Sequence, residues 1–382
     1  MRSTYLVFGS PIIDQSDIDE VVDTLKSGWI GTGPKVHQFE EEFKNYIGVK
    51  HAVAVSSCTA GLHLAAVALN LGPSDEVLVP TMTFAASANA VIHAGAKPVL
   101  VDVDKRDMTI DIEDIRRKIT PNTKAIVPVH FAGRACDVEA IERIAGEYGL
   151  KIIHDTAHAI ETEFNGKKIG GYSDIASYSF YVTKNLVTAE GGMVTTNDDE
   201  LAAKIKIYAL HGMSKDAWKR FSDDGYKHYQ VLFPGFKYNM TDIQAALGIQ
   251  QIKRIEKYSK RRREIWQRYK TELKDLPLLL PTEPSENTRH AYHLFTVLLD
   301  RDKAGISRDK LLAELHKRNI GTGVHYIALH LHPFYQEAFG YKAGDFPNAE
   351  FISERTLSIP FSAKLTDEDV SDVINALKEI LQ

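Results

Sequence analysis

Short apolar segments of strand length alternate with helical segments over residues 52–154, and this alternation constrains the fold more than any other feature of the chain. Strands are expected at residues 52–56, 76–79, 98–101, 125–129 and 151–154, with helices at 59–71, 84–94, 112–119 and 138–148. Continuous apolar strands joined by helices are typical of a mostly parallel sheet covered on both faces. The sequence therefore predicts an α/β fold whose ligand-binding loops follow the carboxyl ends of the strands.

The pattern differs on either side of this region. Amphipathic helices are expected at residues 16–26 and 36–47, before the first strand. After it we expect strands at 175–180 and 192–196, a helix at 199–211, a polar insert at 215–230 and one long helix over 241–273. Residues 277–287 contain three prolines and no periodicity, which is typical of a linker. A strand at 293–299 and helices at 307–318 and 366–380 follow. We therefore expect a large α/β domain over residues 1–250, which includes an N-terminal substrate-entrance segment, and a smaller α+β domain over residues 251–382.

Composition excludes several classes of protein. The 382 residues are 44% hydrophobic and 25% charged, as in an ordinary globular protein. A formal charge of -5 argues against a nucleic-acid-binding protein, and the basic run at 260–263 lies in a helical pattern typical of a solvated or subunit-facing surface. The two cysteines, Cys58 and Cys136, lie far apart without metal-ligand spacing, so neither a disulfide framework nor a metal site is expected. Without a signal-like or membrane-spanning segment, the chain is expected to be cytoplasmic.

Lys184 lies between a strand-like apolar stretch and a glycine pair, in the run Ser177-Tyr-Ser-Phe-Tyr-Val-Thr-Lys-Asn-Leu-Val-Thr-Ala-Glu-Gly-Gly192. Most lysines are solvated surface charges, and Lys184 alone could be one of them. A lysine amine can also form a Schiff base with an aldehyde cofactor, and pyridoxal phosphate is held in this way with an acid on its ring nitrogen. The hypothesis therefore requires a phosphate site and an acid elsewhere in the chain.

The other parts of such a site follow expected strands. Ser56-Ser-Cys-Thr-Ala-Gly61 joins a strand to a helix, where free amides and the helix dipole favour a phosphate, and we select Thr59 and Ala60 as its ligands. Asp155 ends a strand and could pair with a protonated pyridine nitrogen, and His158 could face the ring. Thr59 could instead serve only as a helix cap, and Asp155 could instead be a turn residue.

Three further features belong to the same hypothesis. The Ser179 hydroxyl, at a strand end, could reach the phosphate, and Phe84 could stack on a flat heteroaromatic ring, although an aromatic at a helix start is more often core. The turn Ala189-Glu-Gly-Gly192 is expected to use backbone conformations that favour glycine.

These motifs resemble those of the DegT/DnrJ/EryC1/StrS sugar-nucleotide aminotransferases, which are pyridoxal-phosphate enzymes of aminotransferase fold type I. The similarity covers nearly the whole chain. It includes Ser27-Gly-Trp-Ile-Gly-Thr-Gly-Pro-Lys35, Ser57-Cys-Thr-Ala-Gly-Leu-His-Leu64, Asp155-Thr-Ala-His158, Ser179-Phe-Tyr-Val-Thr-Lys184, Gly235-Phe-Lys-Tyr-Asn-Met240 and Gly321-Thr-Gly-Val-His-Tyr326.

The resemblance implies a role for each matching residue. Lys184 is then the Schiff-base lysine, Asp155 the partner of the ring nitrogen and His158 a neighbour of the ring. Thr59, Ala60 and Ser179 are then phosphate contacts. Asn239 is then the residue that reaches the phosphate in the neighbouring subunit, which implies a homodimer with shared active sites.

The resemblance also implies the reaction. Dehydrases of the superfamily carry histidine in place of the lysine, so Lys184 favours transamination, with L-glutamate giving 2-oxoglutarate and a nucleotide-linked keto sugar receiving the amino group. C4 is the expected position of that keto group. Within the family the chain resembles the UDP-4-amino-4-deoxy-L-arabinose:oxoglutarate aminotransferases. It departs from them at Phe84, where tryptophan is expected, and at His154, where an acidic residue is usual.

Substrate contacts and competing functions complete the expectations. Polar and aromatic residues of the entrance segment and of later loops are candidates for substrate binding, and each could instead be structural: Trp29, Ile30, Thr32, Lys35, His211, His325, Tyr326 and His330. The product would be an amino sugar for a cell-surface polysaccharide, lipopolysaccharide or antibiotic. Alternatives are a C3-keto-sugar aminotransferase, another fold-type-I enzyme such as a lyase, or a non-catalytic regulatory protein that binds pyridoxal phosphate.

Overall fold

The computed structural model describes residues 2–172, 174–214 and 229–382. Most of the polar insert expected at 215–230 lies outside the described residues. Within them, no helix is both long and apolar enough to span a bilayer.

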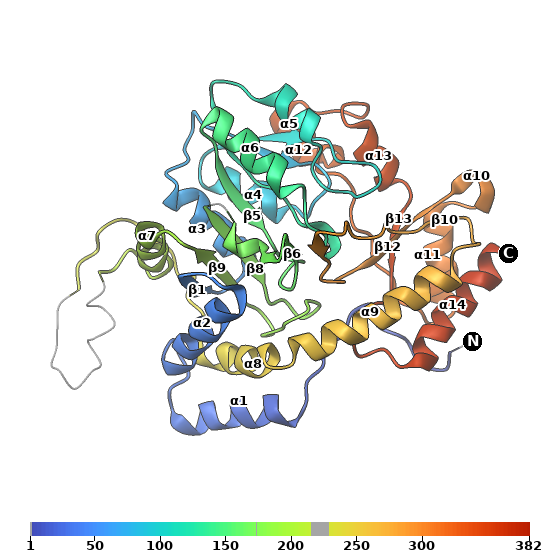
Figure 1. The fold of residues 1–382 in the computed structure, drawn as a ribbon, viewed down its shortest axis with the longest axis horizontal. Coiled ribbons are helices and arrows are strands. Elements are labelled where there is room, and N and C mark those ends of the chain that lie inside the picture. Colours follow the sequence, from blue (N-terminus) through green and yellow to red (C-terminus); the bar gives the residue numbers. More distant parts are fainter. Residues whose placement is uncertain (1, 173, 215–228) are drawn as a thin grey trace.

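A seven-stranded sheet forms the centre of the molecule, in the order β1-β9-β8-β5-β4-β2-β3 (Figure 1). Its strands are β1 (His51–Val55), β2 (Glu76–Pro80), β3 (Lys97–Val101), β4 (Thr123–Ile126), β5 (Lys151–Asp155), β8 (Ile175–Ser179) and β9 (Gly192–Thr196). Neighbouring strands from β3 to β8 pair in parallel, whereas β9 is antiparallel to both β1 and β8. The prediction of an α/β fold with a mostly parallel sheet is confirmed.

Helices cover both faces because alternate strand residues are apolar on each side. On β2, Val77 and Val79 share a core with α3 (Cys58–Ala68), α4 (Ala86–His93) and α7 (Asp199–Ala209). Leu78, between them, belongs to a core with α5 (Ile112–Lys118) and α6 (Val138–Tyr148) on the opposite face. A third core joins α2 (Pro34–Ile47) and α8 (Asp242–Ile252) to β1, β8 and β9.

The long helix expected over residues 241–273 is wrong: α8 ends at Ile252 and α9 (Ile255–Glu272) follows. Arg254, between them, has φ -112° and ψ -1°. Its guanidinium donates to both oxygens of Asp17, at 2.7 and 2.6 Å, on α1 (Gln15–Ser27). This break lets α8 pack against α1 and α2 while α9 extends towards the C-terminal part, and the apolar periodicity continues through it without interruption (Figure 1).

A second, antiparallel sheet contains β10 (Leu278–Leu279), β12 (Phe295–Leu299) and β13 (Thr356–Ile359). Its core includes the last turns of α9 together with α11 (Arg308–Lys317) and α14 (Asp367–Leu381). Strand β10 lies inside the segment expected to be a linker. These residues form a strand because Leu278 is buried and pairs with Leu299. Smaller elements are α10 (Arg301–Ala304) and the sheet of β11 (Thr288–Arg289), β6 (Glu163–Phe164) and β7 (Lys167–Lys168).

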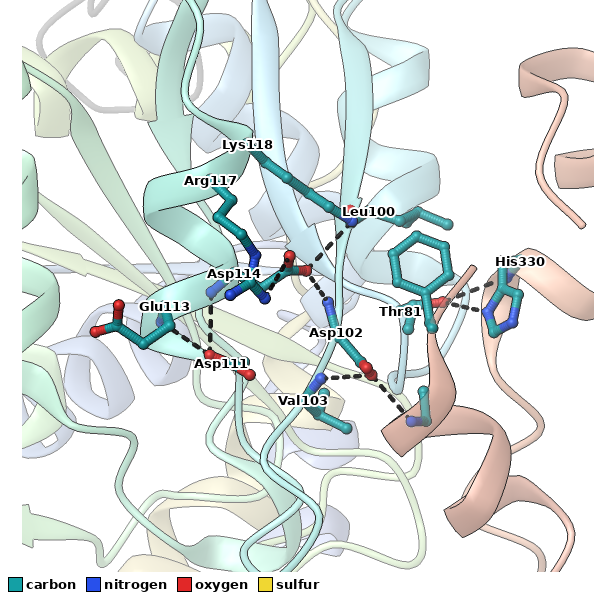
Figure 2. Close-up of polar contacts among 12 residues, drawn as sticks. Thr81, Leu100, Asp102, Val103, Asp111, Glu113, Asp114, Arg117, Lys118 and His330 are labelled. Carbon is teal, nitrogen blue, oxygen red and sulfur yellow. Dashed lines mark hydrogen bonds and ion pairs between the residues drawn. The ribbon is translucent and has the colours of Figure 1, made fainter. Parts of the chain in front are cut away.

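Residues 328–352 pack in the core of the large sheet rather than with the second sheet. This segment contains α12 (Pro333–Phe339) and α13 (Pro347–Ser353), which the sequence did not predict. The Asp102 carboxylate, after β3, accepts from the amides of Asn348 at 3.1 Å and Ala349 at 2.9 Å at the start of α13. Asp114 in turn accepts from the Asp102 amide at 2.7 Å (Figure 2). Residues 328–352 thus belong to the second expected domain by sequence but pack against the large sheet. The boundary between the two domains at residue 250 therefore remains a proposal.

Candidate active site

A cavity of about 400 Å³ opens at the carboxyl ends of the parallel strands. Strand ends, the loop after β8 and the segment after α11 supply its lining. The lining residues are Ser57, Cys58, Thr59, Leu62, Thr83, Phe84, Ala86, Val129, Asp155, Ala157, His158, Ser179, Tyr181, Thr183, Lys184, Glu190, Gly191, His325 and Tyr326. Eight of the residues selected from the sequence therefore share one cavity: Thr59, Phe84, Asp155, His158, Ser179, Lys184, His325 and Tyr326.

Lys184 lies in the loop that follows β8, where its amide donates to the Tyr181 carbonyl at 2.8 Å. Its side chain is partly exposed, and the exposure is to the cavity. Burial lowers the pKa of Lys184 to about 8, against the opposing effect of Cys58 and Asp155. A buried amine with a lowered pKa is more often neutral, and therefore more nucleophilic, than a surface lysine.

Asp155 ends β5 with its carboxylate buried. One oxygen accepts from the Ser87 hydroxyl at 2.7 Å and the other from the Ala157 amide at 3.1 Å. Burial raises the pKa of Asp155, and the Lys184 amine opposes this. Each oxygen keeps a free lone pair, so a charged N–H donor in the cavity would relieve the cost of burying this carboxylate.

The start of α3 meets the same cavity. Ser57 caps the helix by accepting from the Ala60 amide at 3.1 Å, whereas the amides of Cys58 and Thr59 donate to no acceptor within the described part of the chain. Thr59 is exposed in the cavity, and Ala60 is buried outside its lining. Free amides at a helix start favour an anion, so the Thr59 amide suits a phosphate and the Ala60 amide is already used by the cap.

Glycines bring β9 against this helix start. A Cβ on Gly192 would lie 2.5 Å from the Ser57 carbonyl carbon and 2.6 Å from the Cys58 nitrogen. The left-handed conformation expected in this turn occurs instead at Ala189, with φ 66°, whereas Gly191 and Gly192 serve close approach. The Ser179 hydroxyl, on the neighbouring strand end, accepts from the Tyr181 amide at 3.4 Å and also borders the cavity.

His158 and Tyr326 form a polar pair across the cavity wall. The His158 Nδ1 accepts from the Ala132 amide at 3.3 Å, so the neutral ring carries its proton on Nε2. That Nε2 lies 3.4 Å from the Tyr326 hydroxyl. Burial, with Lys184 as a further cause, holds the pKa of His158 well below its usual value. Phe84 is 63% exposed in the cavity, 6.2 Å from the Tyr326 ring.

His325 borders the cavity from the segment after α11. Its Nδ1 lies 2.9 Å from the Ser358 hydroxyl, and burial, assisted by Lys184, lowers the pKa of His325 to about 4. His330 lies outside the cavity and is fully buried, with the Thr81 hydroxyl 2.9 Å from its Nδ1 (Figure 2). Its Nε2 lies 3.0 Å from the Glu350 carboxylate. Since both nitrogens of His330 are bound, the residue fixes the segment 328–352 rather than facing a ligand.

Three residues selected from the sequence lie together at a second hollow, a groove of about 660 Å³ beside α2 and α7. They are Trp29, Thr32 and Asn239. The Asn239 amide donates to the Thr32 hydroxyl at 2.5 Å, and its Oδ1 is buried without a partner in the described residues. Trp29 is 49% exposed. None of the three lines the cavity that contains Lys184.

The remaining candidates for substrate binding lie outside both hollows. Ile30 is exposed, Lys35 forms an ion pair with Glu20, and His211 is exposed with φ 57°. Sequence reasoning missed Ser87, which donates to Asp155. Its only signal is its position at the second residue of α4, the helix that follows β2.

The cavity fits pyridoxal phosphate on its own chemistry. Three features border this cavity: a nucleophilic amine, a buried carboxylate without a charged donor, and a helix start with free amides. They match, in turn, the aldehyde, the ring nitrogen and the phosphate of the cofactor. Among the described residues, no cluster of histidine, cysteine and carboxylate side chains could hold a metal ion.

Known proteins match the chain along its whole length. The model of the DegT/DnrJ/EryC1/StrS aminotransferase family matches residues 11–378. The spore coat polysaccharide biosynthesis protein SpsC of Bacillus subtilis is 48% identical over 382 residues, which cover 100% of this chain and 98% of SpsC. Among solved structures, the pyridoxal-phosphate form of Spr1654 from Streptococcus pneumoniae is 32% identical with a TM-score of 0.91, covering 99% of this chain and 100% of that one.

Helicobacter pylori PseC, an aminotransferase involved in the biosynthesis of pseudoaminic acid, is 29% identical with a TM-score of 0.91 and covers 99% of each chain. The family match and the SpsC alignment each span nearly the whole chain. The chain belongs to the DegT/DnrJ/EryC1/StrS aminotransferase family.

Proposed function

We propose that this aminotransferase moves the amino group of L-glutamate to the C4 keto group of a sugar carried on a nucleoside diphosphate. The observation that carries the proposal is the buried Lys184 amine, which shares a cavity with the Asp155 carboxylate and the amide-rich start of α3. This arrangement suits an aldehyde cofactor, and the chain is a pyridoxal-phosphate enzyme by its family.

When bound, pyridoxal phosphate supplies an aldehyde that condenses with amines and a ring that withdraws electrons from them. The free amides of α3, with Thr59 and Ser179, are proposed to bind its phosphate. The Asp155 carboxylate would pair with the ring nitrogen and favour its protonated form, and Phe84 would offer an aromatic face.

Lys184 then has two tasks. It would hold the cofactor between turnovers, and its amine, when free, would accept and return the proton at the reacting carbon as general base and acid. A pKa of about 8 suits both directions, because near neutral pH the amine exists in both protonation states. The His158 Nε2–H faces the same cavity, where the Tyr326 hydroxyl lies 3.4 Å away, and it can donate to an oxygen of a bound ligand.

The sugar substrate is supported by relatives rather than by a pocket in this chain. SpsC is named for spore coat polysaccharide biosynthesis, and PseC is an aminotransferase in the biosynthesis of pseudoaminic acid. We therefore propose an amino sugar for a cell-surface polysaccharide as the product. Glutamate as donor and C4 as the acceptor position follow from the motif resemblance.

We further propose a homodimer whose two subunits complete each site. Asn239 and Thr32 line a groove separate from the cavity of their own subunit, and the buried Asn239 Oδ1 has no partner in the described residues. In a dimer this groove can face the partner's cavity, where Asn239 would reach the phosphate and Trp29 the sugar nucleotide. Three other candidates lie outside the cavity of their own subunit, and they would contact the substrate only in the active site of the partner subunit: Ile30, Lys35 and His211.

The test is amino transfer itself. Purified protein loaded with pyridoxal phosphate should be yellow and should bleach on addition of L-glutamate, with 2-oxoglutarate released. A panel of nucleotide-linked 3-keto and 4-keto sugars, with products identified by NMR, then names the acceptor. Bleaching by glutamate without transfer to any keto sugar would refute the sugar substrate, and transfer to a 3-keto sugar would refute the C4 position.

A further inference from the structure

A group of buried polar side chains lies directly behind Lys184. Glu161 is fully buried and forms an ion pair with Arg262 of α9, which is 3% exposed. The same carboxylate accepts from the Asn185 side-chain amide at 2.9 Å. Asn185, which follows Lys184 in the sequence, is therefore held by the buried ion pair of Glu161 and Arg262.

The hydrogen bonds determine which way the Asn185 amide faces. Its Nδ2 donates to Glu161 at 2.9 Å and to the Ala291 carbonyl at 2.9 Å. Both partners are acceptors only, so the nitrogen must face them and Oδ1 must point away. That oxygen lies 3.1 Å from the Nδ1 of His293.

His293 must then donate from Nδ1, because Asn185 presents an oxygen to it. Its Nε2 is unprotonated, and the ring is neutral, since burial and the nearby cations Lys184 and Arg262 keep its pKa well below the usual value. The ring packs at a tilt against His158, with 4.4 Å between centroids and 37° between planes. Two neutral imidazoles with opposite tautomers therefore lie beside each other, one fixed by Asn185 and the other by the Ala132 amide.

We propose that Asn185 and His293 are positioning residues: the Glu161–Arg262 pair fixes Asn185, Asn185 fixes the tautomer of His293, and His293 holds the His158 ring at the cavity. The inference rests on the proposed reaction at Lys184. Neither residue lines the cavity of about 400 Å³, and both border, with Lys184, a separate hollow of only about 30 Å³, so each acts through a neighbour.

The test uses Glu161→Gln, which keeps the size of the side chain. With Arg262 holding the oxygen of the new side chain, the new amide nitrogen would face the Asn185 nitrogen. Reversal of Asn185 relieves this contact between donors, although it gives up the bond to Ala291, and it presents the Asn185 nitrogen to His293. His293 should then carry its proton on Nε2. The readout is ring-nitrogen NMR of the full cofactor-free protein labelled at histidine, with signals assigned from His293→Gln and His158→Gln. The kcat for amino transfer should fall by about tenfold to a hundredfold with little change in KM for the sugar nucleotide, because alignment rather than binding is lost.

Two further variants complete the design. Asn185→Ala removes the oxygen that faces the His293 Nδ1 and should release the His293 ring from its single tautomer, so the network can be tested even where Glu161→Gln does not fold. Asp114→Asn is the matched control, because Asp114 is also a buried carboxylate paired with cations, Arg117 and Lys118, but it lies on α5, which packs in a different core (Figure 2). It should leave the His293 spectrum and kcat unchanged.

The outcomes separate this inference from the proposed function. A His293 ring protonated on Nε2 in the wild-type protein, or a His293 spectrum unaffected by both variants, overturns the positioning role while amino transfer continues. Equal losses of kcat in Asp114→Asn also overturn it, since a general loss of stability then explains the effect. Absence of amino transfer in the wild-type protein refutes the proposed function and leaves the spectra intact.

Discussion

Replacing Gly192 by alanine tests whether the start of α3 must be held in place for the cofactor to bind. Gly192 begins β9 and pairs with the last residues of both β1 and β8, Val55 and Ser179. The added Cβ would lie 2.5 Å from the Ser57 carbonyl carbon, whereas carbon atoms in contact are about 3.5–4.0 Å apart. The atoms that collide are backbone, so the strand and the helix start must separate by about 1 Å.

Two losses are expected from this displacement. Forcing a methyl group into a packed site costs about 1–3 kcal/mol of unfolding free energy. A misplacement of about 1 Å at the phosphate end should also reduce kcat by about a hundredfold and weaken cofactor binding. The assays are thermal and denaturant unfolding, a spectroscopic titration with pyridoxal phosphate, and amino-transfer kinetics.

Gly146→Ala is the matched control. Gly146 lies on α6, and beyond the backbone of its own helix no atom lies within 4 Å of an added Cβ, so alanine should stabilise the helix by about 0.5–1 kcal/mol without affecting the cofactor. Wild-type cofactor affinity in Gly192→Ala would refute the role assigned to the start of α3. Equal effects of the two substitutions would do the same.

Three other predictions concern the cavity. Lys184→Ala should abolish the yellow colour and amino transfer while the circular dichroism spectrum stays unchanged, and turnover at the wild-type rate would contradict its assignment. Because the pKa of Lys184 is lowered to about 8, the neutral amine becomes the major form as the pH rises through about 8. The rate at which cofactor-free protein binds the cofactor should therefore rise with pH and level off above about 8. A rate that keeps rising towards pH 10.5 would indicate an ordinary lysine. Asp155→Asn should lower kcat by about a hundredfold or more, because a neutral amide no longer holds the ring nitrogen protonated, and unchanged kcat measured on loaded protein would exclude that role.

The order of strands and helices could be predicted because each strand of the large sheet is a short apolar run and each helix has its own apolar face. The break between α8 and α9 could not, because the attraction of Arg254 to Asp17 joins residues far apart in the sequence. Strand β10 was hidden for a similar reason: prolines at 277, 281 and 284 surround it, and only its pairing with β12 orders it.

The site shows the same division between local and distant information. Asp155, Lys184 and the Thr59 segment follow strands, and the carboxyl ends of parallel strands lie at one edge of a sheet, so their meeting could be predicted. Ser87 and the pair of Glu161 and Arg262 carry no local motif, because their partners come from other elements. His330 has a polar loop position like that of His325, yet Thr81 and Glu350 occupy both of its nitrogens, which only the folded chain reveals.

The separation of Asn239 from Lys184 gives a decisive test of shared sites. If Asn239 acts in the partner's cavity, a dimer of one Lys184→Ala subunit and one Asn239→Ala subunit has one site with both defects and one site with neither. Mixing the two inactive variants under conditions that exchange subunits should then restore about a quarter of wild-type activity, since about half of the dimers are mixed and each has one intact site. If Asn239 serves its own subunit, every site in the mixture carries one defect and no activity returns. The buried, unpartnered Oδ1 of Asn239 favours recovery, because within the described residues nothing in its own subunit satisfies that atom.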